Sequence, residues 1–412
     1  MKILMIAAGF LPYTFSENLC NGKLALALKE FGHDVTVISK KEEGPTYSEK
    51  WEYPWNTLEA DTRIIAYPVG NRLQRYADLL KSGLISGYPF EGTRWVSRAI
   101  ELGKELLRSG KYDCILSRAP GDDNHVVGYH LARCSHLPWI ANWNDPASPI
   151  WPEPYKHHFP RWEQFSKDSI TRFLLGRCDC STFPSVSLRD HFQEHYPFLK
   201  NKRTAIIPHI GLVDKYFPPV SGPVHDGILR FCHSGNLSEE RDPETLFRAF
   251  QRFDSEFPGK IRFDLLGRRT PICDALLAKY HLEHLVHFPG SCPYFDALKK
   301  MNEYDVFVLV EARLEKGIFF ASKIVDYAQL HKPIWAISPR CGFAADLLGK
   351  HGMYVSDNTS EESVYSSLKE IYRKFLDHSL NGAARLYDEF SPSNVVKRLE
   401  NVIAGCGDTI QS

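Results

Sequence analysis

The sequence predicts an α/β protein of two domains, each built on a doubly wound parallel sheet. Three observations support this fold class. The chain of 412 residues is too long for one hydrophobic core. Short apolar runs rich in β-branched residues alternate with amphipathic helical segments along the chain. A stretch dense in Pro and Gly, DKYFPPVSGPVHDG at 214–227, divides this alternation into two halves and is typical of a linker.

The first half contains seven expected strands: KILMIAAG, HDVTVIS, TRIIAYPV, YDCILSRAP, PWIANWND, CDCSTFP and TAIIPH. The first is read as a strand rather than a signal peptide, because its apolar run is short and no small-residue cleavage site follows it. Helices are expected from about Asn21, Thr93, Asn124, Phe165 and Val186. Two aromatic-rich insertions, 41–61 and 147–162, interrupt the pattern, and each can supply an acceptor platform or core and lid residues.

The second half contains six expected strands: ILRFCHS, IRFDLLG, LVHFPG, DVFVLV, PIWAIS and MYVS. Single helices separate them, which indicates a parallel sheet; these helices begin near Pro243, Pro271, Tyr294, Ser322, Phe343 and Glu361. We therefore expect domains at 1–215 and 216–385, with a helix in 386–412 returning to the first domain. Ligands of such sheets bind at the carboxyl ends of the strands, so two edges facing one cleft would suit group transfer between two ligands.

Composition excludes several classes of protein. The chain has 50 acidic and 50 basic residues, so no global field favours nucleic acid. Ten cysteines without a CxxC pair form neither a disulfide framework nor a zinc pattern, which favours a cytoplasmic location. The basic helix expected at 93–111 would suit peripheral contact with the inner face of a membrane if its basic residues lay on one face. Its acids Glu101 and Glu105 dilute the charge, so a solvated helix is the default interpretation.

The first candidate motif is HSGNLSEERDPETLFRAF, at 233–250. A strand ends at Ser234, Gly235 turns the chain, and Asp242 with Pro243 begins a helix. Backbone N–H groups of such a loop favour a phosphate, and Arg241 would add a charge-assisted hydrogen bond. A capped loop with a solvated Arg explains the same residues. The pattern is not GxGxxG, so it gives little support to a nicotinamide cofactor.

The second candidate motif is EARLEKGIFFASKIVDYAQLHKPIWAIS, at 311–338. Lys323 lies in the first turn of the expected helix, where it opposes the helix dipole and a bound anion would make it favourable. Asp326 lies one turn on from Ser322, on the same face, and can accept hydrogen bonds from a diol such as a ribose. An exposed Lys and an acid in an amphipathic helix are the alternative.

The carboxyl-terminal motifs resemble a known family. The segments SGNLSEERDPETL, FDLLGRR, HFPGSCPY and ASKIVDYAQLHKPI are similar to the second half of glycosyltransferase family 4, whose members are retaining enzymes with two Rossmann-like domains, the GT-B fold. This resemblance implies that Gly235 and Arg241 hold the donor diphosphate, that Lys323 assists them, and that Asp326 holds the donor ribose. It also implies donor contacts at Asn236, Gly267, Phe288, Gly290 and Ser322, with Phe288 and Gly290 near the base.

The amino-terminal half resembles the same family through SRAPGDDNHVVGYHLARCSHLPWIANWNDP and FLPYTFSENLCNGKLALALKEFGHDVTV. The resemblance implies that His125 contacts the transferred sugar and that Asp145 orients the acceptor or the sugar. Each has an ordinary explanation too, since His125 can cap a helix and Asp145 precedes a Pro in a turn. The acceptor side is assigned to Gly9, Phe10, Asn21 and Gly22.

Several positions depart from the family pattern. The first acid of its pair of Glu residues is replaced by Ile318, with Glu315 three residues earlier, and the second is the shorter Asp326. The Pro-Asn-Gly that usually follows the last amino-terminal strand is here the run 208–211, PHIG, and a Gly-Gly in the first loop is reduced to Asn21-Gly22.

We therefore expect a retaining glycosyltransferase that moves a sugar from a nucleotide-diphosphate donor to a carbohydrate, lipid-linked or small-molecule acceptor. It would need no cofactor and no metal, because the chain has no Asp-x-Asp and because Arg241 and Lys323 can stabilise the leaving diphosphate. Two alternatives stay open: a nucleotide-sugar 2-epimerase of the same fold and a non-catalytic nucleotide-sugar-binding protein. The oligomeric state is not indicated.

Overall fold

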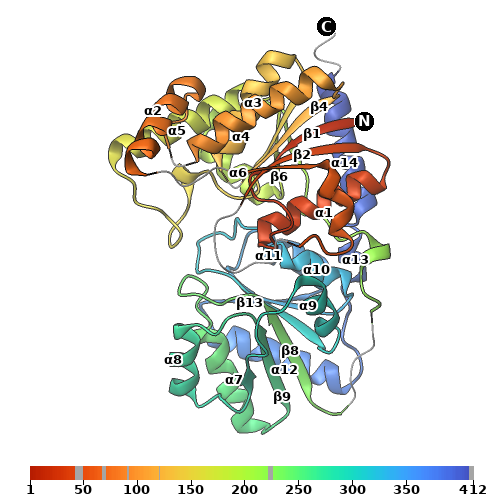
Figure 1. Cartoon of the computed structure of the whole chain (residues 1–412). Coiled ribbons are helices and arrows are strands. Elements are labelled where there is room, and N and C mark those ends of the chain that lie inside the picture. The colour runs from red at the N-terminus through yellow and green to blue at the C-terminus, as the bar shows by residue number, and fades with distance from the viewer. Residues whose placement is uncertain (42–49, 67–70, 91, 120, 221–225, 408–412) are drawn as a thin grey trace. The chain divides into compact units, whose positions relative to one another are not determined.

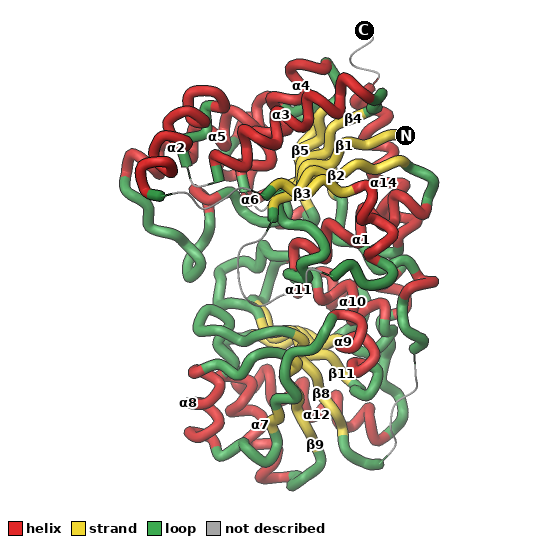
Figure 2. The backbone as a smooth tube through the Cα atoms, in the orientation of Figure 1, coloured by secondary structure: helices red, strands yellow, loops and turns green. Residues whose placement is uncertain are grey.

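The computed structural model describes residues 1–41, 50–66, 71–90, 92–119, 121–220 and 226–407, and it divides into two compact units. The first unit comprises Met1–Trp151, His157–Val213 and the residues from Pro392 onward. The second comprises Pro152–Lys156 and Asp214–Ser391. Each unit holds one parallel sheet flanked by helices, as Figures 1 and 2 show, so the expected α/β class is confirmed.

The first unit has a seven-stranded sheet in the order β3-β2-β1-β4-β5-β6-β7, with every neighbouring pair parallel. All seven expected strands are present. The order reverses between β1 and β4, and ligands of doubly wound sheets bind at such a switch point. The strands are β1 (Lys2–Ile6), β2 (Asp34–Lys40), β3 (Thr62–Ile65), β4 (Cys114–Arg118), β5 (Trp139–Asn142), β6 (Cys180–Phe183) and β7 (Thr204–Ile206).

Helices cover both faces of this sheet. Figure 1 shows α1 and α14 on one face and α3 and α4 on the other. The helices are α1 (Ser16–Glu30), α2 (Arg72–Ser86), α3 (Thr93–Ser109), α4 (Asp122–Ser135), α5 (Arg161–Arg177), α6 (Val186–His195) and α14 (Pro392–Gly407), with 3₁₀ turns at Trp55–Asp61, Ser148–Ile150 and Pro197–Asn201.

Helix α2 was not expected from the sequence. Its ends are well defined, because the Asn71 side chain accepts a hydrogen bond from the Gln74 backbone N–H and Gly87 closes the helix at φ +68°. Several of its apolar side chains are exposed rather than packed in the core, Leu84 being 88% exposed. Helix α2 packs mainly against α3.

Helix α3, the basic helix considered for membrane contact, packs its apolar side into the unit. Trp95, Val96, Ala99 and Ile100 are all buried. At Gly103 an added side chain would clash with Leu131 of α4, so the two helices lie in close contact. The apolar side of α3 is therefore used by the core and is not available to a bilayer.

The second unit has a six-stranded sheet in the order β10-β9-β8-β11-β12-β13, again entirely parallel. All six expected strands and the six expected helices are present, and the switch point lies between β8 and β11. The strands are β8 (Leu229–Ser234), β9 (Ile261–Leu266), β10 (Val286–His287), β11 (Val306–Val310), β12 (Ile334–Ser338) and β13 (Tyr354–Asp357).

The helices of the second unit are α7 (Glu244–Glu256), α8 (Pro271–Tyr280), α9 (Tyr294–Met301), α10 (Lys323–Gln329), α11 (Phe343–Lys350), α12 (Glu361–Leu376) and α13 (Ala384–Tyr387), with a 3₁₀ turn at Asp214–Tyr216. The core of this unit includes Phe231 of β8, Phe250 of α7 and Trp335 of β12.

Some expectations fall on residues outside the described ranges. These are 42–49 in the first aromatic insertion and 221–225 in the Pro- and Gly-rich linker. None of the ten cysteines, all of which lie within the described ranges, forms a disulfide. Within the described ranges, no helix combines the length and the apolar character that crossing a bilayer requires.

Candidate functional site

The switch point of the second sheet brings together residues from the two carboxyl-terminal motifs. Strand β8 ends at Ser234, and Gly235 follows at φ +111°, a backbone region that favours glycine. A side chain added at Gly235 would lie 3.0 Å from Nζ of Lys323, at the start of α10. Gly235 and Lys323, which are 88 residues apart in the printed sequence, are thus neighbours in the fold.

The loop after β8 is also fixed to the loop after β9. A side chain added at Gly267 would clash with the carbonyl oxygen of Gly235 and lie 2.8 Å from Oδ1 of Asn236. The same Oδ1 accepts a hydrogen bond of 2.7 Å from the backbone N–H of Arg268. Gly267 therefore permits the close approach of the two loops, and Asn236 holds it.

Lys323 lies against His233, a residue that the sequence reading gave no role. The fully buried ring of His233 donates from Nδ1 to the Val308 carbonyl oxygen over 2.9 Å, which leaves Nε2 as an acceptor 3.1 Å from Nζ of Lys323. Burial, together with the charge of Lys323, holds the pKa of His233 well below its usual value. Burial and the charge of Arg241 lower the pKa of Lys323 to about 7.

Arg241 is partly buried at the same site. Its Nε donates to the hydroxyl oxygen of Tyr155 over 3.1 Å, and the Tyr155 ring meets that of Phe319 edge-on with centroids 5.2 Å apart. Tyr155 comes from the second aromatic insertion, within Pro152–Lys156 of the second unit. The insertion therefore orients the Arg241 guanidinium, a contact that no local sequence pattern indicates.

Glu311 is a buried acid that the sequence reading quoted but did not select. It follows β11 directly and is 9% exposed, and its Oε2 has no hydrogen-bond partner among the described residues. Burial raises its pKa to about 7, although the charge of Arg241 opposes the rise. Glu315 is exposed and Ile318 is buried and apolar, so Glu311 is the buried carboxyl of this loop. The available signal was an acid immediately after an apolar strand.

Asp326 is held by a neighbouring helix. Its Oδ1 accepts a hydrogen bond of 2.8 Å from the hydroxyl of Tyr294, the first residue of α9. Ser322 occupies the position just before α10, and the hydroxyl oxygen of Tyr327, one residue after Asp326, accepts from the backbone N–H of Ser234 over 2.8 Å. Helix α10 is thus tied to the end of β8 close to Gly235.

Phe288 and Gly290 lie on the loop after β10. Phe288 is partly buried against the core, and the guanidinium of Arg269 lies 5.1 Å from its ring centroid. Gly290 has φ +87°, with open space where a side chain would stand. The loop therefore presents the aromatic ring of Phe288, and at Gly290 it has space that no side chain fills.

The switch point of the first sheet gathers the residues assigned to the acceptor side. Asn21 Nδ2 donates to the carbonyl oxygen of Gly9 over 2.8 Å, and Asn18 Nδ2 donates to that of Phe10 over 2.9 Å. The buried Arg118, at the end of β4, donates from Nε to Oδ1 of Asn21. Gly22 has a packing role, because a side chain there would lie 2.5 Å from Leu11.

Asp145 lies near an acid that the sequence reading missed, Glu17 in the first turn of α1. Asn144 Nδ2 donates to Oε1 of Glu17 over 2.7 Å. Burial raises the pKa of Glu17 to about 8; Asp145 adds to the rise, while Arg118 and His209 oppose it. Acids are common in first helical turns, so sequence alone did not mark Glu17.

His125 is fully enclosed in the first unit. The hydroxyl of Ser117 accepts from Trp139 Nε1 over 2.7 Å and lies 2.8 Å from Nδ1 of His125. Burial lowers the pKa of His125 to about 3, so the ring is neutral. The ring centroid is 4.0 Å from that of Trp143.

Comparison with known proteins finds a family that part of the chain resembles. Residues 22–210 match the model of Glycosyltransferase Family 4. The family match begins within α1, after β1, and ends before β8. No curated protein matches the chain.

Solved structures resemble the whole chain, at identities that establish the fold alone. Sucrose-phosphate synthase from Thermosynechococcus elongatus has a TM-score of 0.71 at 14% identity, covering 99% of each chain. HepE from Anabaena, in complex with UDP and glucose, has a TM-score of 0.65 at 15% identity, covering 98% of this chain and 99% of its own. A UDP-N-acetylglucosamine 2-epimerase scores 0.54 at 13% identity, over 99% and 97%. The GT-B fold expected from the family 4 resemblance is confirmed.

Proposed function

We propose that the chain is a retaining, metal-independent glycosyltransferase. It takes a sugar from a nucleotide-diphosphate donor held by the second unit and passes it to a carbohydrate, lipid-linked or small-molecule acceptor recognised by the first unit. The observation that carries this proposal is the pairing of two cations, Arg241 and Lys323, beside the Gly235 turn at the switch point of the second sheet. The proposed enzyme uses no cofactor.

The cations suit the chemistry of a leaving diphosphate. As the bond between the sugar carbon and the β-phosphate oxygen breaks, its electron pair stays with that oxygen and negative charge grows there. Arg241 and Lys323 oppose this charge, and the backbone N–H groups after Gly235 add dipoles. A bound diphosphate also favours the charged form of Lys323, whose pKa in the unliganded site is about 7.

The remaining donor contacts follow from the same site. Asp326, held by Tyr294, is assigned to the ribose diol, and Phe288 with Gly290 to the base. We assign Glu311 to a hydroxyl of the donor sugar, because its free Oε2 is a buried acceptor without a partner among the described residues. Glu311 would then supply the acid that the family pattern places at Ile318.

On the acceptor side, Glu17 and Asp145 are the acids assigned to the acceptor hydroxyl, which loses its proton as it bonds to the sugar carbon. His125 is enclosed, so we assign it a positioning role through Trp143 and Ser117 instead of contact with the sugar. Retention of the anomeric configuration rests on the family 4 resemblance.

A 2-epimerase remains the second candidate because one of the solved structures of similar fold is such an enzyme. The family match favours the transferase, since it covers the unit that an acceptor would need. The two differ in their products: a transferase releases the nucleoside diphosphate, whereas an epimerase returns an intact nucleotide sugar with one inverted carbon.

Release of nucleoside diphosphate from UDP-, GDP-, ADP- and dTDP-sugars in the absence of acceptor tests the proposal. One donor should be hydrolysed slowly, and Arg241→Ala or Lys323→Ala should lower the rate about a hundredfold. Arg248→Ala is the control, because Arg248 lies within α7, the helix that follows Arg241, but is 53% exposed and paired with Glu361. Unchanged rates in the two site variants would contradict the assignment, and an inverted donor would identify the epimerase.

A further inference from the structure

Helix α2 carries a row of exposed apolar side chains. Leu73, Tyr76, Leu80 and Leu84 are 80%, 67%, 69% and 88% exposed. Their spacing of three, four and four residues places them along one side of the helix. Leaving such a row in water is unfavourable, because moving one Leu side chain from water into an apolar environment lowers the free energy by about 2 kcal/mol.

A second helix extends this row. Trp162 and Phe165, in the first turns of α5, are 67% and 75% exposed. Within the described ranges, the other large apolar side chain exposed to this degree is Tyr53, at 68%. We call Leu73, Tyr76, Leu80, Leu84, Trp162 and Phe165 the α2–α5 apolar surface. Such a concentration of exposed apolar groups marks an interaction site.

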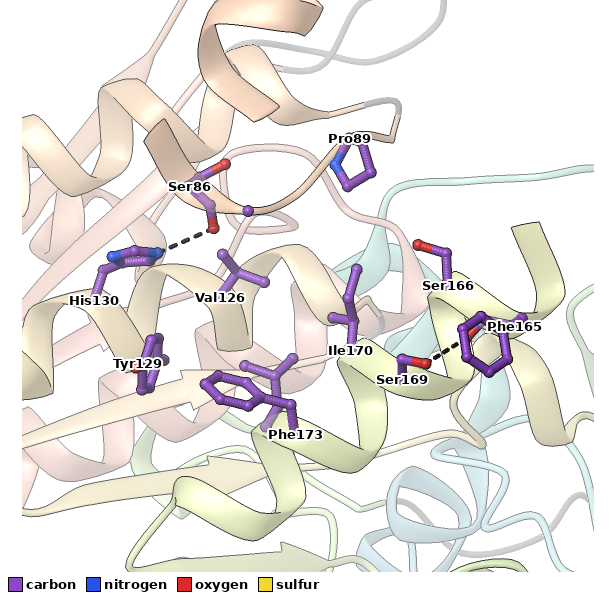
Figure 3. A pocket seen from close by; sticks show the side chains of 12 residues that line it. Ser86, Pro89, Val126, Tyr129, His130, Phe165, Ser166, Ser169, Ile170 and Phe173 are labelled. Atoms are coloured by element: carbon purple, nitrogen blue, oxygen red, sulfur yellow. Dashed lines mark hydrogen bonds between the residues drawn. The ribbon is translucent and has the colours of Figure 1, made fainter. Parts of the chain in front are cut away.

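A cavity continues the apolar surface into the protein. It has a volume of about 510 Å³ and lies among the end of α2, α4 and α5 (Figure 3). Val126 and Leu174 are its buried apolar residues, and the more exposed Phe165 and Phe173 also line it. Its polar groups are largely engaged, as the His130 ring is 3.0 Å from the Ser86 carbonyl oxygen.

Basic side chains border the α2–α5 apolar surface. On α2, the exposed Arg72 and Lys81 lie roughly 90° to either side of the apolar row, whereas the exposed Arg75 lies on the opposite side of the helix. Arg161, at the start of α5, is also exposed. The sequence of α2 contains three basic residues and a single acid. A helix with an apolar side, basic flanks and interfacial Tyr or Trp is the pattern of a helix that lies in the headgroup region of an anionic membrane.

We propose that the α2–α5 apolar surface docks on an anionic lipid bilayer, with α2 lying in the plane of the interface. The apolar side chains enter the boundary of the acyl chains while Arg72 and Lys81, which flank them, meet the lipid phosphates. The docking does not depend on sugar transfer. Resting on the proposed function, it further selects the lipid-linked acceptor class, since such an acceptor is itself held in the bilayer.

Vesicle co-sedimentation without any nucleotide sugar tests the docking. The full chain should sediment with vesicles of equimolar phosphatidylcholine and phosphatidylglycerol, and much less with pure phosphatidylcholine. Leu80→Asp with Leu84→Asp should lower the partition coefficient at least about tenfold, since charged groups are excluded from the apolar boundary. Each of Arg72→Gln and Lys81→Gln should lower it about fivefold on anionic vesicles, and Arg75→Gln, on the opposite side of α2, should lower it less.

The matched control is Leu376→Asp, because Leu376 is 54% exposed at the end of α12 in the second unit. It should leave sedimentation unchanged, and all variants should keep the wild-type circular dichroism and melting point. Failure of the wild-type chain to sediment, or equal losses in Leu376→Asp, would overturn the proposal. So would a dimer in solution that the Leu80 and Leu84 changes convert to monomer, because a second copy would then cover the surface. Nucleotide binding in the α2 variants, measured separately, reports on the proposed function.

Discussion

Glu311 and Lys323 are two buried ionisable groups whose pKa values converge from opposite directions. Burial disfavours the charged form of both, so the pKa of the acid rises to about 7 and that of the amine falls to about 7. Arg241 adds a positive charge that opposes the first shift and reinforces the second. The charge of the site therefore changes around neutral pH.

We predict that affinity for a nucleoside diphosphate falls as the pH rises through 7. Below this value Lys323 is charged and Glu311 is neutral, whereas above it Lys323 loses its proton and Glu311 becomes an anion that repels the diphosphate. Glu311→Gln removes the second change, so it should strengthen binding about threefold to tenfold above neutrality and have little effect below it. Calorimetric titration from about pH 6 to about pH 8 measures this.

Glu315→Gln is the control for this pH profile, because Glu315 is an exposed acid in the same loop. It should leave the profile of the wild-type chain unchanged. A wild-type affinity that is flat across neutrality, or that increases with pH, would show that these two groups do not face the diphosphate.

Sequence patterns identified some residues of the site and missed others for a physical reason. Gly235, Arg241 and Lys323 stand in local motifs, where a strand end, a turn and a helix start are visible along the chain. Tyr155 reaches Arg241 from 86 residues away, and no local pattern predicts that contact. Glu311 and Glu17 depend on burial, which a single sequence does not give.

At the scale of elements, the thirteen strands followed from their apolar runs, because strands covered on both faces must be apolar throughout. Helix α2 was missed, although Leu73, Tyr76, Leu80 and Leu84 recur at helical spacing along the sequence. The close approach of the loops after β8 and β9 was invisible, since it depends on the absence of a side chain at Gly267.

We predict that Gly267→Ala destabilises the chain by about 1–3 kcal/mol and weakens nucleotide binding. The new methyl group would clash with the Gly235 carbonyl oxygen, so one loop must move. Urea denaturation measures the stability. Gly349→Ala in α11 is the control, because no atom lies near its added methyl group, and Ala is favoured in helices by about 1 kcal/mol. Equal stability of the Gly267 variant and the wild-type chain would contradict the close approach.

At the scale of the whole molecule, two sheets with the same kind of switch point carry different chemistry. The second unit offers cations around one buried acid, which suits a diphosphate and its sugar. The first unit offers acids near a buried Arg118 and His209, which suits hydroxyl groups. With 50 acidic and 50 basic residues in the chain, ligand choice is set by these local clusters rather than by net charge.

Titration calorimetry of the full chain with UDP, GDP, ADP and dTDP tests the central claim, that the second switch point binds a nucleoside diphosphate. We expect at least one of the four to bind, and Arg241→Ala and Lys323→Ala each to weaken that binding about tenfold or more, while Arg248→Ala leaves it unchanged. Absence of binding by all four, or unaltered binding in both site variants, would contradict the account.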